Sequence, residues 1–128
     1  MSTPDTGSAL PPEKSTAPAK ATIQYDDFAK LELKTGIIRA AEKVEKADKL
    51  LCLQVDLGSE TRTIVSGIAL HYAPETLIGQ SVTVVTNLAP RKMKGIESNG
   101  MILMAESTDG KLVFIQPAQP IDPGAIIS

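Results

Sequence analysis

The chain has 128 residues, 42% of them hydrophobic, which suffices for the core of one domain and is too short for two ordinary ones. Aromatic residues make up 3% and Trp is absent, so the core has to be built from Ile, Val, Leu and Met, a composition that favours strands. The net charge of −2 counts against a protein that coats nucleic acid through a broad basic surface, but it allows a local basic patch.

The first 22 residues differ in composition from the rest of the chain. Four prolines fall among Ser, Thr, Ala and Lys, which predicts a disordered linker or tail at 1–22 and one folded domain at 23–128. The start lacks the basic and apolar regions of a signal peptide, and no apolar stretch approaches the roughly 18 residues that cross a membrane. With a single cysteine, these features predict a cytoplasmic protein that has no membrane partner.

The apolar pattern begins at Ile23. Residues 25–31 predict one short helical turn, with an Asp available as its cap. Alternating apolar side chains at 31–37 then predict a long strand, and Gly36 within it is typical of a bulge or a tight bend, which a small barrel needs in its first strand.

A hairpin is predicted next. Residues 51–57 alternate cleanly between apolar and polar, and 62–67 return as a strand after a turn at 58–60. A short helical connection is expected from 71 to 78, beginning near Pro74.

Three further strands are predicted at 81–86, 101–105 and 112–115, the last two joined by a turn at 108–110. Short strands at this spacing, with a helical connection after the third, indicate an all-β fold. We expect a five-stranded OB-type Greek-key barrel with short helices and a C-terminal strand extension.

The most unusual segment is 87–101. Arg91, Lys92 and Lys94 fall within four positions between a proline and a glycine, and apolar Met93 and Ile96 can anchor the segment. The domain from 23 onward holds 11 basic against 13 acidic residues, so positive charge is concentrated here. Arginine can bind a phosphate bidentately and lysine acts as a point charge, which predicts a loop that binds a shaped phosphate backbone. The alternative is a solvated loop without a ligand.

No catalytic group is predicted. Cys52 sits in an apolar run and is best explained as a small buried hydrophobe, and His71 as a surface residue. Phosphate-binding glycine motifs are absent from the sequence, and one Cys with one His cannot build a metal site of the usual kind. We therefore expect no catalytic residues, no metal and no cofactor.

Several ordered motifs carry a resemblance to a known family. They are Tyr25-Asp26-Asp27-Phe28 with Leu33, Ala47-Asp48-Lys49-Leu50-Leu51, Thr63-Ile64-Val65-Ser66-Gly67-Ile68, Asn87-Leu88-Ala89-Pro90-Arg91-Lys92-Met93-Lys94-Gly95 and Glu97-Ser98-Asn99-Gly100-Met101. From about Ile23 to its end the chain resembles the tRNA-binding domain at the C-terminus of many bacterial methionyl-tRNA synthetases. The same domain occurs in structure-specific tRNA-binding proteins and in relatives of endothelial monocyte-activating polypeptide.

The resemblance implies an OB-fold that grips the outer corner of tRNA by its shape and backbone. The binding candidates that it implies are Arg91, Lys92, Lys94, Ser98 and Met101, with Asn87, Lys34 and Arg39 as weaker ones. Where Ala89 stands the family often has a Lys, so weaker binding is expected here. The family commonly dimerises through the segment that corresponds to 102–127, which implies a homodimer.

A parent synthetase is a further implication of the resemblance. The Pro- and Ala-rich start is similar to the tether that joins this domain to a synthetase body, whose own motifs are absent from the 128 residues. The domain would then raise tRNA affinity in cis, or act in trans beside the enzyme, while the methionyl-tRNA synthetase catalytic body does the chemistry. The alternative is a dimeric protein-interaction or chaperone module of the secretion-chaperone type on the same fold.

Overall fold

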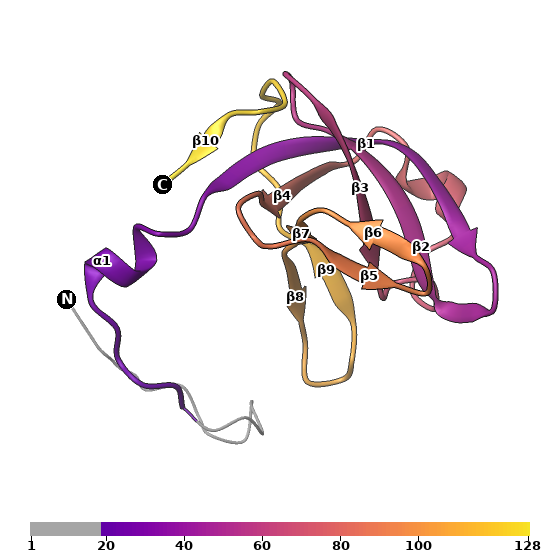
Figure 1. Ribbon diagram of the computed structural model, residues 1–128, viewed down its shortest axis with the longest axis horizontal. Helices are drawn as coiled ribbons and strands as arrows, with labels where there is room; N and C mark the ends of the chain where they lie inside the picture. Colours follow the sequence, from indigo (N-terminus) through magenta and orange to yellow (C-terminus); the bar gives the residue numbers. More distant parts are fainter. Residues whose placement is uncertain (1–18) are drawn as a thin grey trace.

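In the computed structural model, which describes residues 19–128, the longest strand, β1, arches over the whole barrel (Figure 1). The strands are β1 (Leu33–Val44), β2 (Ala47–Asp56), β3 (Thr61–Ser66), β4 (Ser81–Val85), β5 (Arg91–Met93), β6 (Ile96–Ser98), β7 (Met101–Ile102), β8 (Met104–Glu106), β9 (Leu112–Phe114) and β10 (Ile126–Ile127). The helical elements are α1 (Tyr25–Phe28) and the 3-10 turn η2 (Pro74–Leu77). Of the predicted linker, residues 1–18 lie outside the described part of the chain.

The main sheet confirms the predicted barrel. Five of its six strands run antiparallel in the order β3-β2-β1-β4-β7, which is a Greek-key arrangement because the fourth strand returns beside the first. β1 pairs with β4 through 33–37 and with β2 from Ile37 to Val44, so one strand belongs to both halves of the barrel. Its length allows this, since it continues well beyond the 31–37 that the sequence predicts.

The predicted irregularity in β1 lies elsewhere than expected. Gly36 stays in register opposite Val82, and the ladder with β2 shifts instead between Ile38 and Ala40, at Arg39. Gly36 serves close packing, because a Cβ at this position would lie 2.7 Å from a methyl carbon of Val55. The expectation of a bulge at Gly36 is therefore wrong, and the first register shift of β1 falls three residues later, with a second between Lys43 and Val44.

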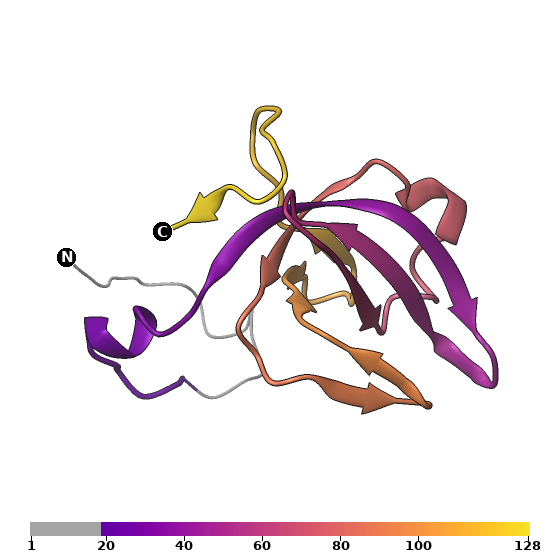
Figure 2. The same cartoon turned by 45° about the horizontal axis from the view of Figure 1, so that its top comes forward.

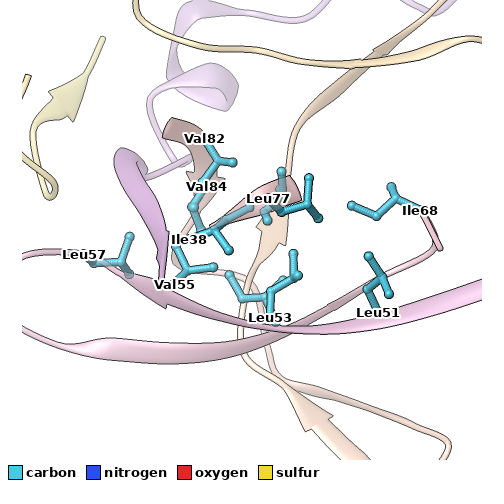
Figure 3. Close-up of a cluster of buried hydrophobic side chains, with 11 residues drawn as sticks. Ile38, Leu51, Leu53, Val55, Leu57, Ile68, Leu77, Val82 and Val84 are labelled. Carbon is cyan, nitrogen blue, oxygen red and sulfur yellow. The ribbon is translucent and has the colours of Figure 1, made fainter. Parts of the chain in front are cut away.

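The core fills the barrel with the aliphatic residues that the composition predicted (Figure 3). The alternating side chains of β2 point inward, and Leu51, Leu53 and Val55 are fully buried. On the opposite face of β2, Cys52 packs with Val44 and Ala47 in a second, smaller cluster. Its burial confirms the prediction of a small buried hydrophobe. That burial, and secondarily the charge of Glu42, raises the pKa of the Cys52 thiol.

The predicted helical elements are shorter than expected. α1 is capped by Gln24 in place of an Asp, and the Asp27 carboxylate accepts a hydrogen bond from the Gln24 backbone N–H at 3.2 Å. η2 occupies only 74–77 of the predicted 71–78, and its Leu77 is buried in the barrel core. Among residues 19–128, no helix has the length and apolar character to cross a membrane.

The strand predicted at 101–105 is divided in two. Met101 and Ile102 pair with β4 as β7, whereas Met104 to Glu106 pair with β9 as β8, so the ladder changes partner at Leu103. The β8–β9 hairpin and its turn agree with the prediction.

The chain after β9 crosses the outer face of β1 and β4. Thr83 Oγ1 donates to the Ile115 carbonyl at 2.8 Å, and Thr35 Oγ1 donates to the Asp122 carbonyl at 2.9 Å. β10 then pairs with Leu33 and Lys34, on the edge of β1 that β2 occupies further along (Figures 1 and 2). This is the predicted C-terminal strand extension.

The barrel closes between β3 and the turn after β6. The Asn99 backbone N–H donates to the Thr63 carbonyl at 2.8 Å. The Val65 backbone N–H donates to Ser98 Oγ at 2.9 Å, and Ser98 is only 4% exposed. At this seam, where β3 meets the end of β6, a side-chain hydroxyl takes the place of the backbone carbonyl that a neighbouring strand would supply.

Ser98→Ala removes that acceptor and leaves the buried Val65 N–H unpaired. We expect the free energy of unfolding to fall by about 1–3 kcal/mol, the usual cost of an unsatisfied buried donor. Urea denaturation measures the change, with Ser59→Ala, an exposed serine in the β2–β3 turn, as control. Equal stability of the Ser98 variant and the wild type would contradict a closing role for this hydroxyl.

Candidate nucleic-acid interface

The basic segment forms a β-hairpin, where the sequence predicted a loop. β5 and β6 pair in the register Arg91 to Ser98, Lys92 to Glu97 and Met93 to Ile96, with a two-residue turn at Lys94-Gly95. Both turn residues have positive φ, 53° at Lys94 and 82° at Gly95, as a type I′ turn requires. The sequence pattern did not predict a hairpin, because Lys is an unusual first residue for this turn and only the glycine indicates a turn of this type.

The three cationic side chains of the hairpin lie on different sides of it. Side chains alternate along a strand, so Lys92 and Glu97 share one face while Arg91, Met93, Ile96 and Ser98 share the other. Lys94 stands at the turn, and all three cations are exposed. Ile96 packs against the cluster around Cys52, which anchors the hairpin as predicted. Met93, the second predicted anchor, is half-buried and lies outside that cluster. Figure 2 shows the hairpin projecting along one edge of the barrel.

Arg91 and Met101 lie at one cavity, of about 240 Å³, at the base of the hairpin. Its walls are Val65, Leu88, Ala89 and Gly100, with Ser98 at the buried end. The Arg91 guanidinium lies 3.6 Å from the Met93 sulfur and forms no ion pair among the described residues. The structure therefore brings Arg91, Ser98 and Met101 together.

Ser98 and Asn87 are engaged inside the protein. The hydroxyl of Ser98 serves the barrel seam described above. The Asn87 carboxamide bridges to the segment after α1, since its oxygen accepts from Glu32 N–H at 2.9 Å and its nitrogen donates to the Lys30 carbonyl at 2.7 Å. These bonds hold the chain where β4 leads into the hairpin.

Arg39 and Lys34 lie on β1. Arg39 forms an ion pair with Asp56, with 2.9 Å between guanidinium nitrogen and carboxylate oxygen. A hydrogen bond from the Gly58 N–H, followed by that from Arg39, lowers the pKa of Asp56, so the charge of Arg39 is compensated locally. Lys34 is half-buried and adds to the positive surroundings of Glu60.

Arg62 on β3 is a residue that the sequence analysis missed. Its guanidinium donates to the Thr86 carbonyl and to the Glu60 carboxylate, the latter at 3.0 Å, and the hydrogen bond to Glu60 is the main cause of that group's lowered pKa. Thr86 directly precedes the hairpin segment, and Thr63, the neighbour of Arg62, holds its far end through Asn99. A lone Arg in a short strand carries no pattern that could have revealed this placement.

Within residues 19–128, no group of three or more His, Cys, Asp or Glu side chains is placed to hold a metal ion. The interface presents positive charge on a hairpin, bonded to the barrel at its base, beside a small, mostly apolar cavity. Such a surface suits phosphates together with an apolar group, as in a nucleic acid.

Comparisons with known proteins agree with this chemistry. The family described as "Putative tRNA binding domain" matches residues 33–126. The methionine–tRNA ligase of Bacteroides fragilis is 54% identical over 108 residues, and that of Flavobacterium psychrophilum is 59% identical over 104. These matches cover 84% and 81% of this chain but only 16% and 15% of the ligases.

Two solved structures support the same fold. A MetRS related protein from Pyrococcus horikoshii superimposes with a TM-score of 0.80 at 40% identity, covering 85% of this chain and 100% of that one. The chaperone CsaA from Bacillus anthracis superimposes with a TM-score of 0.77 at 29% identity, covering 84% and 100%. The barrel, the basic hairpin and the family match agree, and the chain belongs to the tRNA-binding domain family related to methionyl-tRNA synthetase.

Proposed function

We propose that the chain is a non-catalytic module that binds tRNA by shape and raises the tRNA affinity of a methionyl-tRNA synthetase, in cis as its C-terminal domain or in trans. The observation that carries the proposal is the exposed basic hairpin on a domain whose net charge is negative. The ligase relatives, of which the matches cover about one sixth, support a role as one part of a larger enzyme. The neighbour from Pyrococcus horikoshii, matched over its whole length, supports an independent module.

We assign phosphate contacts to Arg91, Lys92 and Lys94. Because the hairpin is fixed at its turn and its base, the cations stand at set positions and match a phosphate backbone of defined shape without reading bases. Lys34 is a secondary candidate. Arg39 and Asn87 act on the fold, since each is engaged in an internal interaction.

Exposed apolar side chains on the outer face of β1 and β4 support a homodimer. Ile115, Ile121 and Ile126 of the C-terminal segment are 41%, 50% and 79% exposed, and they line an apolar hollow of about 300 Å³ on the face of β1 and β4. Contiguous exposed apolar side chains of this kind mark interaction sites. We propose that 102–127 forms the dimer interface.

The dimer is tested by light scattering behind a sizing column. The expected mass is twice the 13.5 kDa of the chain, and Ile121→Asp, which places a charge in the apolar hollow, is expected to return it to one chain. A wild-type mass equal to that of one chain at micromolar concentration would contradict the proposed dimer.

A chaperone-type module is the second candidate. The likeness to the chaperone CsaA and the apolar hollow on the outer face favour it. Binding of a chemically unfolded polypeptide, with no affinity for tRNA, would select this function over the first.

The primary test is a titration of bulk tRNA at several salt concentrations with wild type and an Arg91→Ala, Lys92→Ala, Lys94→Ala variant. Each lost phosphate contact is expected to reduce the slope of log K against log salt by about 1, so the triple variant should bind much more weakly and depend less on salt. A Lys20→Ala, Lys43→Ala, Lys111→Ala variant removes the same charge from exposed sites outside the hairpin and should bind nearly as the wild type does. Equal losses in both variants would argue against a local site.

A further inference from the structure

The cavity at the base of the hairpin has no role in a purely phosphate-based interface. We propose that it takes one unpaired nucleobase of an RNA whose phosphates lie along the hairpin. This proposal rests on the proposed function and adds a base-binding pocket to it. The carrying observation is that Arg91, a phosphate-binding candidate, also lines a mostly apolar cavity.

The dimensions of the cavity suit a single ring system. Its volume of about 240 Å³ lies below the roughly 300 Å³ at which pockets for drug-sized ligands begin. Leu88 and Met101, 42% and 45% exposed, present apolar surface at its mouth. A planar base could cover these side chains and remove their apolar surface from water.

The walls of the cavity contain no aromatic side chain, so other groups have to stack on the base. The four aromatic residues lie elsewhere: Tyr25 and Phe28 in α1, and Tyr72 and Phe114 packed on one another with ring centroids 5.1 Å apart. Arginine planes also stack on RNA bases, and a thioether makes favourable contacts with aromatic rings. Arg91 and Met101 are therefore the stacking partners in this pocket.

The buried end of the cavity keeps one hydrogen-bond donor available. Ser98 Oγ accepts firmly from Val65 N–H, whereas its own hydroxyl lies 3.5 Å from the Gly100 carbonyl, at the long limit for a hydrogen bond. That proton can be donated to an acceptor on a base edge without cost to the barrel seam. The hydroxyl thereby orients the base, while the apolar walls hold it.

Charge favours RNA over a peptide as the occupant. An apolar peptide side chain could fill the same volume, but it gains nothing from the exposed Arg91, Lys92 and Lys94 beside it. A nucleotide matches both features, because its phosphate meets the cations while its base enters the cavity.

The test compares two RNAs with the same number of phosphates: a tRNA, which has unpaired loop bases, and a blunt, fully paired duplex. Ala89→Leu fills the cavity without changing charge, and Ala105→Leu, at an exposed position of β8, is the matched control. We expect Ala89→Leu to weaken tRNA binding about fivefold, the low end of what the loss of base stacking costs, and to leave duplex binding and the salt slope unchanged. The control should bind both RNAs as the wild type does.

Met101→Ala offers a second route to the same result if Ala89→Leu perturbs the fold. It removes a stacking surface, and Val113→Ala, at a site of equal 45% exposure on β9, controls for truncation. Unchanged tRNA affinity in both cavity variants, or equal losses on tRNA and duplex, would overturn the base pocket while tRNA binding itself stands. A wild type that binds neither RNA overturns the proposed function as well. If Ala89→Leu lost binding of an unfolded polypeptide but kept tRNA binding, the cavity would belong to peptides and the proposal would be overturned.

Discussion

The interface depends on the seam that closes the barrel. Two hydrogen bonds join β3 to the end of the hairpin, Asn99 N–H to Thr63 and Val65 N–H to Ser98 Oγ. Because they are made at the last residue of β6 and the next one, they fix the hairpin on the barrel at its base. Val65 and Ser98, which form the second of these bonds, also line the cavity, so closure of the barrel places part of the candidate binding surface.

A second constraint acts where the chain enters the hairpin. The Arg62 guanidinium holds the Thr86 carbonyl, and the Asn87 carboxamide ties the next residue to the segment after α1. Both ends of the basic segment are thereby attached, and its turn is set by two residues with positive φ. A negatively charged domain can in this way present three cations at defined positions, which long-range charge alone could not achieve.

Much of this arrangement was predictable from local patterns. Alternation at 51–57 correctly predicted the buried face of β2, and the overall order of elements predicted the barrel. The bulge at Arg39 and the division of the strand at Leu103 were missed, because both depend on which partner a strand meets and not on its own residues. The cations of the site stand out in the sequence, but the burial of Ser98, the bonds of Asn87 and the placement of Arg62 arise only from tertiary contacts. Only the structure could therefore show which candidates are exposed and which are engaged within the fold.

The most direct test of the central claim is a nuclear magnetic resonance map of the uniformly ¹⁵N-labelled chain during titration with tRNA. We expect the largest shift changes or line broadening at 91–98, at the cavity residues Ala89 and Met101, and at β3 across the seam. Residues 115–127 and η2, on other faces of the domain, should change little. Changes centred on 115–127, with the hairpin unaffected, would contradict the claim that the docked basic hairpin is the RNA-binding surface.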